Sequence, residues 1–307
     1  MTAETKPARR RMSPLARREA IDGYIGILPW LIGFLAFTLL PLCAAVGLSF
    51  CYWDILTPIR WAGVENYLNI LRDPLVKNAL WNTFRYTVVV VPATTALGLA
   101  IAMMLNQRTK GILFFRIVYY LPSVLPGVAV AMLWMWMFNP DFGVINTMLS
   151  YIGIQGPAWL NDKTWAMWAI VIRACWGVGG GMILFLAALQ GVPVSYYEAA
   201  TIDGANAWHR FRHIVIPMIK PNLVFVLIMS TISAFMLFTP VDVLTMGRGT
   251  PGTSTMVLML HIKIQGIQLG ETGYTSAVSI LLLTIILTIS LVQWFLSREN
   301  KREGRRA

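Results

Sequence analysis

The polar segment QGVPVSYYEAATIDGANAWHRFRHIVIPMIKP, residues 190–221, separates two long apolar runs and is the most informative part of the chain. Ser195 and Glu198 have the S-x-x-E spacing of a capping box, in which each side chain satisfies a free backbone N–H at the start of a helix. Gly204 can take the left-handed conformation that ends a helix, and Asn206 can cap the helix that follows. The segment is therefore predicted to form a helix from Ser195, a glycine turn and a second helix.

The same segment contains an ordered pattern of motifs: L-Q-x-x-P, Y-E-A-A at 197–200, I-D-G-A at 202–205, then Phe211, Ile216-Pro217 and Pro221. This pattern resembles the EAA loop of bacterial ABC importer permeases, most closely that of the carbohydrate-uptake branch. In that family the first short helix docks in a cleft of a separate ATPase subunit. The alternative is a solvated loop that only joins two spans, but small residues favour docking because they permit close approach. The resemblance implies an ATPase-coupling role for Ser195, Tyr197, Glu198, Ala199, Ala200, Asp203, Gly204 and Ala205.

The second predicted helix of this segment has an apolar face. Trp208, Phe211 and Val215 recur at helical spacing, so they are predicted to pack on the rest of the protein while Arg210 and Arg212 face outward.

Composition places the whole chain in a membrane. Hydrophobic residues make up 57% of it and charged residues 13%, and its mean hydropathy is +0.63. Runs of about 20 apolar residues can cross a hydrocarbon core of roughly 30 Å. We expect an all-α integral membrane protein with six transmembrane helices in one permease domain, 24–297, between basic cytoplasmic tails at 1–23 and 298–307; the resemblance implies the ABC type I importer permease fold. The six spans are predicted at 24–49, 86–106, 113–138, 164–189, 222–242 and 275–297.

The basic residues outside these spans are distributed unequally between the two sides. One side would carry 16: Lys6, Arg9, Arg10, Arg11, Arg17, Arg18, Arg108, Lys110, Arg210, Arg212, Lys220, Arg298, Lys301, Arg302, Arg305 and Arg306. The other would carry 6: Arg60, Arg72, Lys77, Lys163, Arg248 and Lys263. Lys and Arg accumulate in cytoplasmic loops, so both termini and residues 190–221 are predicted to be cytoplasmic, in a bacterial inner membrane. The net charge of +11 then reflects this bias and attraction to anionic lipid, and no nucleic-acid partner is expected.

No metal or enzymatic constellation is expected. His209 and His213 have the i, i+4 spacing of a metal pair but lack a convincing third ligand, which favours a solvated or ATPase-contacting role. The three cysteines Cys43, Cys51 and Cys175 have no metal or redox spacing.

The chain also lacks the G-x-x-x-x-G-K-[S/T] phosphate loop. The glycines at 177 and 179–181 lie in an apolar span, where they allow close helix packing or access to a cavity. No catalytic residue and no cofactor is therefore expected in this chain, and a partner ATPase would bind ATP and Mg.

Three further segments resemble the carbohydrate branch: W-x-G-x-x-N-Y from 61, D-F-G-V-I-N from 141 and T-x-G-x-G-T-P from 245. The resemblance implies a heterodimer with a second permease subunit, two ATPase subunits, an external solute-binding protein and a carbohydrate substrate. The alternatives are a permease of this architecture for a non-sugar solute and an ion-coupled secondary transporter. The second alternative calls for buried carboxylates or inverted repeats, which are not found.

The substrate path is predicted from interrupted spans. Pro122 and Pro126 free backbone carbonyls that are tolerated only where they face protein or water. By resemblance to maltose-type permeases, the path would be lined by Ser123, Gly127, Trp176, Gly177, Gly180, Ser230 and Ser233. Trp176 suits a stacking platform for a sugar and ordinary packing equally well.

Arg173 is the costliest residue of the predicted spans, because a buried cation needs pairing or hydration. Snorkelling toward the outer interface or a pair with another subunit is favoured, and lining the substrate path is the alternative.

Overall fold

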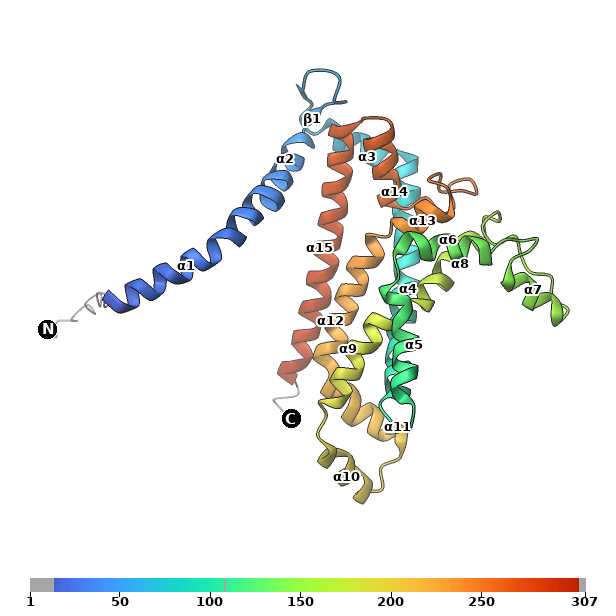
Figure 1. Ribbon diagram of the computed structural model, residues 1–307. Coiled ribbons are helices and arrows are strands. Elements are labelled where there is room, and N and C mark those ends of the chain that lie inside the picture. Colours follow the sequence, from blue (N-terminus) through green and yellow to red (C-terminus); the bar gives the residue numbers. More distant parts are fainter. Residues whose placement is uncertain (1–13, 108, 304–307) are drawn as a thin grey trace.

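The computed structural model describes residues 14–107 and 109–303, which fold into a helical bundle built around α4 (Figure 1). Helix α4 contacts α8, α9 and α12, and α12 in turn contacts α15. The bundle helices are α4 (Pro74–Leu105), α8 (Trp165–Trp176), α9 (Gly179–Gln190), α12 (Ile216–Phe235) and α15 (Thr272–Glu303). This arrangement confirms the predicted helical membrane-protein fold.

By length and composition, four helical stretches of the described residues can each cross a membrane: Arg17–Leu48, Pro74–Leu105, Ala207–Leu244 and Thr272–Ser297. Two bent pairs bring the number to six if each pair is one span: α5 (Ile112–Val124) with α6 (Gly127–Met137), and α8 with α9. The six predicted spans fall on these helices and pairs.

The predicted span 113–138 is not one straight helix, because α5 and α6 meet at an angle of 99°. Leu125 takes an extended conformation (φ −69°, ψ 144°) directly before Pro126. A residue before proline is driven out of the helical region, and proline itself cannot donate to the helix. Pro122, by contrast, stays inside α5. The pair α8 and α9 bends by 41°, at Gly177 and Val178.

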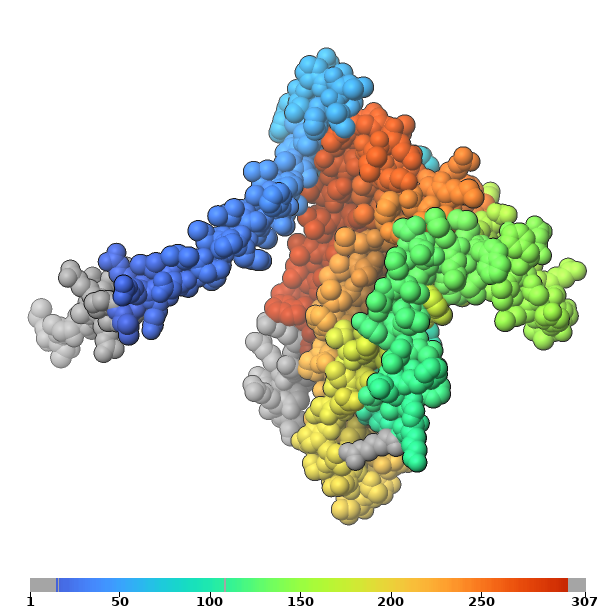
Figure 2. All heavy atoms as spheres, in the orientation of Figure 1, coloured from blue at the N-terminus to red at the C-terminus, as the bar shows by residue number. Residues whose placement is uncertain are grey.

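The N-terminal helices form an arm that stands away from the bundle (Figures 1 and 2). It consists of α1 (Pro14–Phe34), the π-helical turn η1 (Leu35–Leu39) and α2 (Leu40–Leu48). The most apolar window of this arm has a mean hydropathy of 2.3, yet none of it is buried. At the end of the arm, α2 packs on α15.

The end of the bundle next to α2 carries the longer connections, and we call it the outer end (Figure 1). Its elements are β1 (Cys51–Tyr52), β2 (Arg60–Trp61), α3 (Glu65–Arg72), α13 (Thr239–Leu244), α14 (Leu258–Lys263) and the π-helical turn η3 (Ile264–Gln268). Helix α7 (Val144–Tyr151) stands out to one side of the bundle (Figure 1). The two short strands pair antiparallel, with Cys51 opposite Trp61. Helix α4 fixes the loop before α14, because Asn82 Nδ2 donates to the carbonyl oxygens of Thr253 and Met256 at 2.8 and 3.0 Å.

One carboxylate joins the outer ends of the two longest helices. Asp73 caps α4 by accepting a hydrogen bond from the Leu75 N–H at 2.7 Å, and Pro74 occupies the first helical position, where its missing N–H costs nothing. The second oxygen of Asp73 accepts from the Tyr274 hydroxyl of α15 at 2.8 Å. The beginnings of α4 and α15 are thus tied together.

Two apolar clusters fill the bundle. The outer cluster contains Trp134, Phe138 and Ile170, and the inner cluster contains Met182 and Phe185. In the inner part α4 packs on α9 at Gly98, where a Cβ would lie in ordinary contact, 3.5 Å from the backbone nitrogen of Met182.

The predicted tails overlap the ends of the first and last helices. The first helix already begins at Pro14, within the predicted N-terminal tail 1–23, and α15 continues to Glu303, within the predicted tail 298–307. Residues 1–13 and 304–307, which carry many of the basic residues of the two tails, lie outside the described residues.

Candidate functional site

The predicted coupling segment forms a separate helical unit at the end of the bundle opposite the outer end (Figure 1). It comprises α10 (Val194–Ile202), α11 (Ala207–Arg210) and the π-helical turn η2 (Phe211–Val215), which continues into α12.

The predicted capping box at Ser195 is wrong. Pro193 is the N-cap of α10, with φ −60° and ψ 136°, and no side chain caps this helix end. Ser195 lies inside the first turn, so it lacks the extended conformation with which an N-cap serine reaches back to the backbone. The Ser195 and Glu198 side chains are exposed, and neither makes a hydrogen bond with a described residue.

The predicted glycine turn is confirmed. Gly204 has φ +72°, its N–H donates to Thr201 at 3.1 Å, and the Ala205 N–H donates to Ala200 at 2.8 Å. These two bonds form a Schellman motif, which needs a left-handed residue at the position of Gly204. Asn206 caps the next helix as predicted, because its Oδ1 accepts from the His209 N–H at 2.8 Å.

The packing predicted for the second helix holds for two of its three residues. Val215 is buried and Phe211 packs on the inner cluster, but Trp208 is 67% exposed. The π-helical turn that begins at Phe211 contains more residues per turn than an α-helix, so the face that includes Trp208 is rotated away from the bundle.

The outward surface of α10 is apolar at several positions. Val194, Tyr196 and Ile202 are exposed, Ile202 by 86%, whereas Ala200 is buried and Tyr197 packs on the inner cluster. The unit projects beyond the rest of the bundle (Figure 2). The exposed apolar side chains lie on a helix that is free to contact a protein partner.

Tyr197 and the histidine pair have defined surroundings. Burial raises the pKa of the Tyr197 phenol above its usual value, and the Arg210 cation opposes this, so the hydroxyl stays protonated at neutral pH. The rings of His209 and His213 stack with centroids 4.0 Å apart. Among the described residues no third His, Cys, Asp or Glu joins them to form a metal-binding group.

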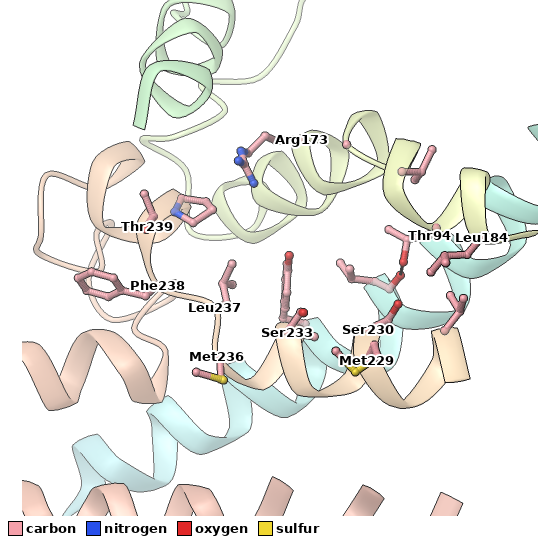
Figure 3. Close-up of a pocket in the computed structure, with 18 residues that line it drawn as sticks. Thr94, Arg173, Leu184, Met229, Ser230, Ser233, Met236, Leu237, Phe238 and Thr239 are labelled. Atoms are coloured by element: carbon pink, nitrogen blue, oxygen red, sulfur yellow. Dashed lines mark hydrogen bonds between the residues drawn. The ribbon is translucent and has the colours of Figure 1, made fainter. Parts of the chain in front are cut away.

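A cavity of about 470 Å³ lies between the bundle helices α4, α8, α9 and α12 (Figure 3). Much of its wall is apolar, including Val90, Leu184 and Leu237. Its polar groups are the hydroxyls of Tyr86, Thr94, Ser230, Ser233 and Thr239 and the guanidinium of Arg173. An apolar cavity with a few polar groups is the usual form of a small-molecule site, and its volume lies in the range of about 300–1,000 Å³ typical of such sites.

Several of these hydroxyls are available to a ligand. Thr94 Oγ1 donates to the Val90 carbonyl at 2.7 Å, but the hydroxyls of Tyr86, Ser230, Ser233 and Thr239 make no hydrogen bond with a described residue. In Figure 3 Ser230 and Ser233 face Arg173 across the open space. The cavity wall therefore carries hydrogen-bonding groups from several helices.

The structure brings together three of the seven predicted path residues: Gly177, Ser230 and Ser233 line the cavity. Gly127 lies beside it, since a Cβ there would be 3.9 Å from Thr239. Ser123, Trp176 and Gly180 are not part of the wall. Trp176 packs edge-on against Trp134 with ring centroids 5.9 Å apart, and Ser123 donates to the Tyr120 carbonyl at 2.7 Å.

Arg173 lies in the cavity wall. This position favours the prediction that Arg173 lines a cavity over the prediction that its side chain snorkels toward the outer interface. Sequence reasoning missed Tyr86, Thr94 and Thr239. Tyr86, Val90 and Thr94 are spaced by four residues, which places them on one face of a helix and was a usable signal.

Gly179 of α9 packs tightly against α5, and we expect its replacement by alanine to loosen this pair. A Cβ there would lie 2.5 Å from the Tyr119 carbonyl oxygen and 2.9 Å from the Tyr120 Cα. Overpacking of this kind costs about 1–3 kcal/mol. Thermal unfolding of the purified protein would measure the loss. The matched control is Gly180→Ala, where no atom lies within 4 Å, and equal melting temperatures for the two variants would contradict the prediction.

An ion pair fixes the cavity wall at the outer end. Lys263 Nζ lies 2.6 Å from Asp242 Oδ1, joining α14 to α13, and the same ammonium lies 5.9 Å from the centre of the Phe238 ring. Phe238 and Thr239 line the cavity.

Lys263→Met is expected to lower the stability of the fold by about 1–2 kcal/mol, because it leaves a partly buried carboxylate without its partner. Adding Asp242→Asn removes the unpaired carboxylate charge and should restore part of the lost stability. Melting temperatures of the two single variants and the double variant would give the coupling energy. Strictly additive effects would mean that the pair contributes nothing.

The structure is a helical membrane protein with a cavity between its helices and a projecting helical unit at one end. Residues 94–301 match the family described as binding-protein-dependent transport system inner membrane component. The chain belongs to this family.

Two of its relatives match over nearly their whole length. The probable ABC transporter permease protein YesP of Bacillus subtilis is 37% identical, and the match covers 94% of this chain and 95% of the relative. The trehalose/maltose transport system permease protein MalF of Thermococcus litoralis is 36% identical, with 91% and 95% covered. A bacterial alginate ABC transporter, solved in complex with an alginate pentasaccharide-bound periplasmic protein, has the same fold, with a TM-score of 0.81, 24% identity and 92% and 96% covered.

Proposed function

We propose that this chain is a membrane subunit of a binding-protein-dependent ABC importer and carries a carbohydrate through the cavity between α4, α8, α9 and α12. The observation that supports this most directly is the set of unpartnered hydroxyls of Tyr86, Ser230, Ser233 and Thr239 in a partly apolar cavity. Sugars present hydroxyls and apolar ring faces, which such a wall can match. The names of the relatives, trehalose/maltose and alginate transporters, point the same way.

The coupling segment would connect this cavity to an ATPase. The exposed surface of α10 docks on one of two ATPase subunits, which bind ATP and Mg, and this chain needs no cofactor of its own. Helix α10 is joined through the Gly204 turn to the helical stretch Ala207–Leu244, which includes Ser230 and Ser233. Movement of α10 would therefore reach the cavity wall along one helical stretch and drive alternating access.

The other partners follow from the remaining surfaces. A second permease subunit would pair with this chain and cover the apolar arm α1–α2, which is unburied here and otherwise faces lipid. The solute-binding protein would deliver its ligand at the outer end. Both chain termini and α10 would lie on the cytoplasmic side, because most basic residues of the connections lie there.

Vesicles that contain the complete transporter would test the proposal. We expect ATP-dependent, vanadate-sensitive uptake of a saccharide that requires the binding protein. Uptake driven by an ion gradient without ATP would overturn the importer class. Uptake of an amino acid or an inorganic anion in place of any saccharide would overturn the carbohydrate assignment.

A further inference from the structure

Arg173 is the single charged residue in the wall of the cavity. None of the other described residues that line it is a Lys, Asp or Glu, and Tyr86 is its one other ionisable side chain. The guanidinium extends from α8 toward the open space (Figure 3). The cavity therefore carries a net positive charge at the place where a solute would bind.

None of the described residues neutralises the charge of Arg173. Arg173 makes no hydrogen bond and no ion pair with a described residue, and its Nε is sealed from solvent without a partner. The carboxylate of the adjacent α13, Asp242, is already engaged by Lys263 at 2.6 Å. Arg173 thus lies in the wall as a partly buried cation whose donors are free.

Such a cation is unfavourable in an empty cavity and favourable once an anion binds. Burying an unpaired guanidinium at membrane depth costs several kcal/mol. A carboxylate offers two acceptor oxygens that match the guanidinium fork, and these charge-assisted bonds are about twice as strong as neutral ones. Ser230 and Ser233, on the opposite wall, are placed to hold the neutral hydroxyls of the same solute.

We infer that the cavity takes an anionic saccharide, one with a uronate carboxylate that binds Arg173 while the serine hydroxyls bind its sugar hydroxyls. This inference rests on the proposed carbohydrate function. It assigns Arg173 the role of selecting charged over neutral sugars within the membrane, separately from any selection by the binding protein.

The test uses the complete transporter in vesicles with di- and trisaccharides of galacturonate, glucuronate and mannuronate, each paired with its neutral methyl ester. The wild-type protein should take up at least one acid faster than its ester. Arg173→Gln should lower that uptake roughly 10- to 100-fold, the effect of losing one hydrogen-bonded charge, and leave ester uptake unchanged. Arg173→Lys should retain part of the preference. Arg85→Gln, an exposed cation of α4 outside the cavity wall, is the matched control and should change neither.

Four results would overturn the inference, and they differ in what they imply for the proposed carbohydrate function. Uptake of the esters in preference to the acids overturns the inference and leaves the carbohydrate function intact. Equal loss of both classes in Arg173→Gln, with loss of the second permease on purification, assigns Arg173 to an intersubunit pair and also overturns it. Uptake of another saccharide but of neither class by the wild-type transporter overturns this inference alone, whereas uptake of no saccharide at all overturns the proposed function and this inference together.

Discussion

Gly204→Val is expected to lower coupled uptake at least about tenfold while the protein still inserts and assembles. Gly204 has φ +72°, and no atom lies within 4 Å of the position that a Cβ would take. A side chain would therefore meet no clash, and the whole effect would come from the backbone. A left-handed conformation costs a residue with a Cβ about 1–2 kcal/mol, and more when that side chain is β-branched.

This free-energy cost destabilises the turn that joins α10 to α11. Its two hydrogen bonds, from Gly204 to Thr201 and from Ala205 to Ala200, both require this conformation. When the turn opens, α10 no longer moves as one body with α12, and ATP-driven uptake should fall at least about tenfold, the equivalent of 1.4 kcal/mol. Uptake and ATP hydrolysis measured on the same vesicles would show hydrolysis that continues without transport.

Gly204→Asn is the matched control. Asparagine tolerates the left-handed region better than other residues with a Cβ, so this variant should retain most of the uptake. If valine and asparagine impair uptake equally, the backbone explanation is wrong. If valine leaves uptake unchanged, the turn is not part of the coupling pathway.

Ser233→Trp is expected to block the cavity. Ser233 is an exposed residue of α12 in the wall of a cavity of about 470 Å³, facing Arg173 across the open space. An indole ring there would occupy much of the volume that a solute needs. Overpacking of 1–3 kcal/mol corresponds to a loss of affinity of roughly 10- to 100-fold. Transport-coupled ATP hydrolysis and uptake should fall together, unlike in Gly204→Val.

Two variants separate blockage from misfolding. Phe225→Trp introduces the same ring on an exposed position of the same helix outside the cavity wall, and it should be neutral. Ser233→Ala removes only the hydroxyl and should weaken uptake less than tryptophan does. Normal uptake by Ser233→Trp would mean that the solute passes elsewhere.

Local signals made the coupling segment the most predictable part of the chain. A glycine that must take positive φ and an asparagine that caps a helix act on the nearest few residues, so Gly204 and Asn206 could be interpreted from sequence. The start of α10 was misplaced because Pro193 takes the N-cap position two residues before Ser195. Two competing signals for a helix start lay side by side, and the capping box was the weaker one.

Other features depend on contacts that one segment cannot reveal. The helical spacing predicts a buried face for Trp208, and this prediction is wrong. A π-helical turn shifts the helical phase, and a sequence pattern does not show such a turn. Pro122 and Pro126 looked alike, yet only Pro126 breaks the helix. The cavity joins Tyr86 and Thr94 of α4 to Arg173 of α8 and Ser230 of α12, which are brought together only by packing.

The carboxylate of Asp73 gives the bundle a common pivot. It holds the first turn of α4 and the hydroxyl of Tyr274 at the start of α15, so the two longest helices are fixed to each other at one end. Helix α4 has 32 residues, and at 1.5 Å per residue it is about 48 Å long. Tilting a lever of that length by about 5° around this point moves its far end by about 4 Å. The displacement produced by a rotation of α4 about this carboxylate would therefore be smallest at the outer end and largest at the end where α10 lies.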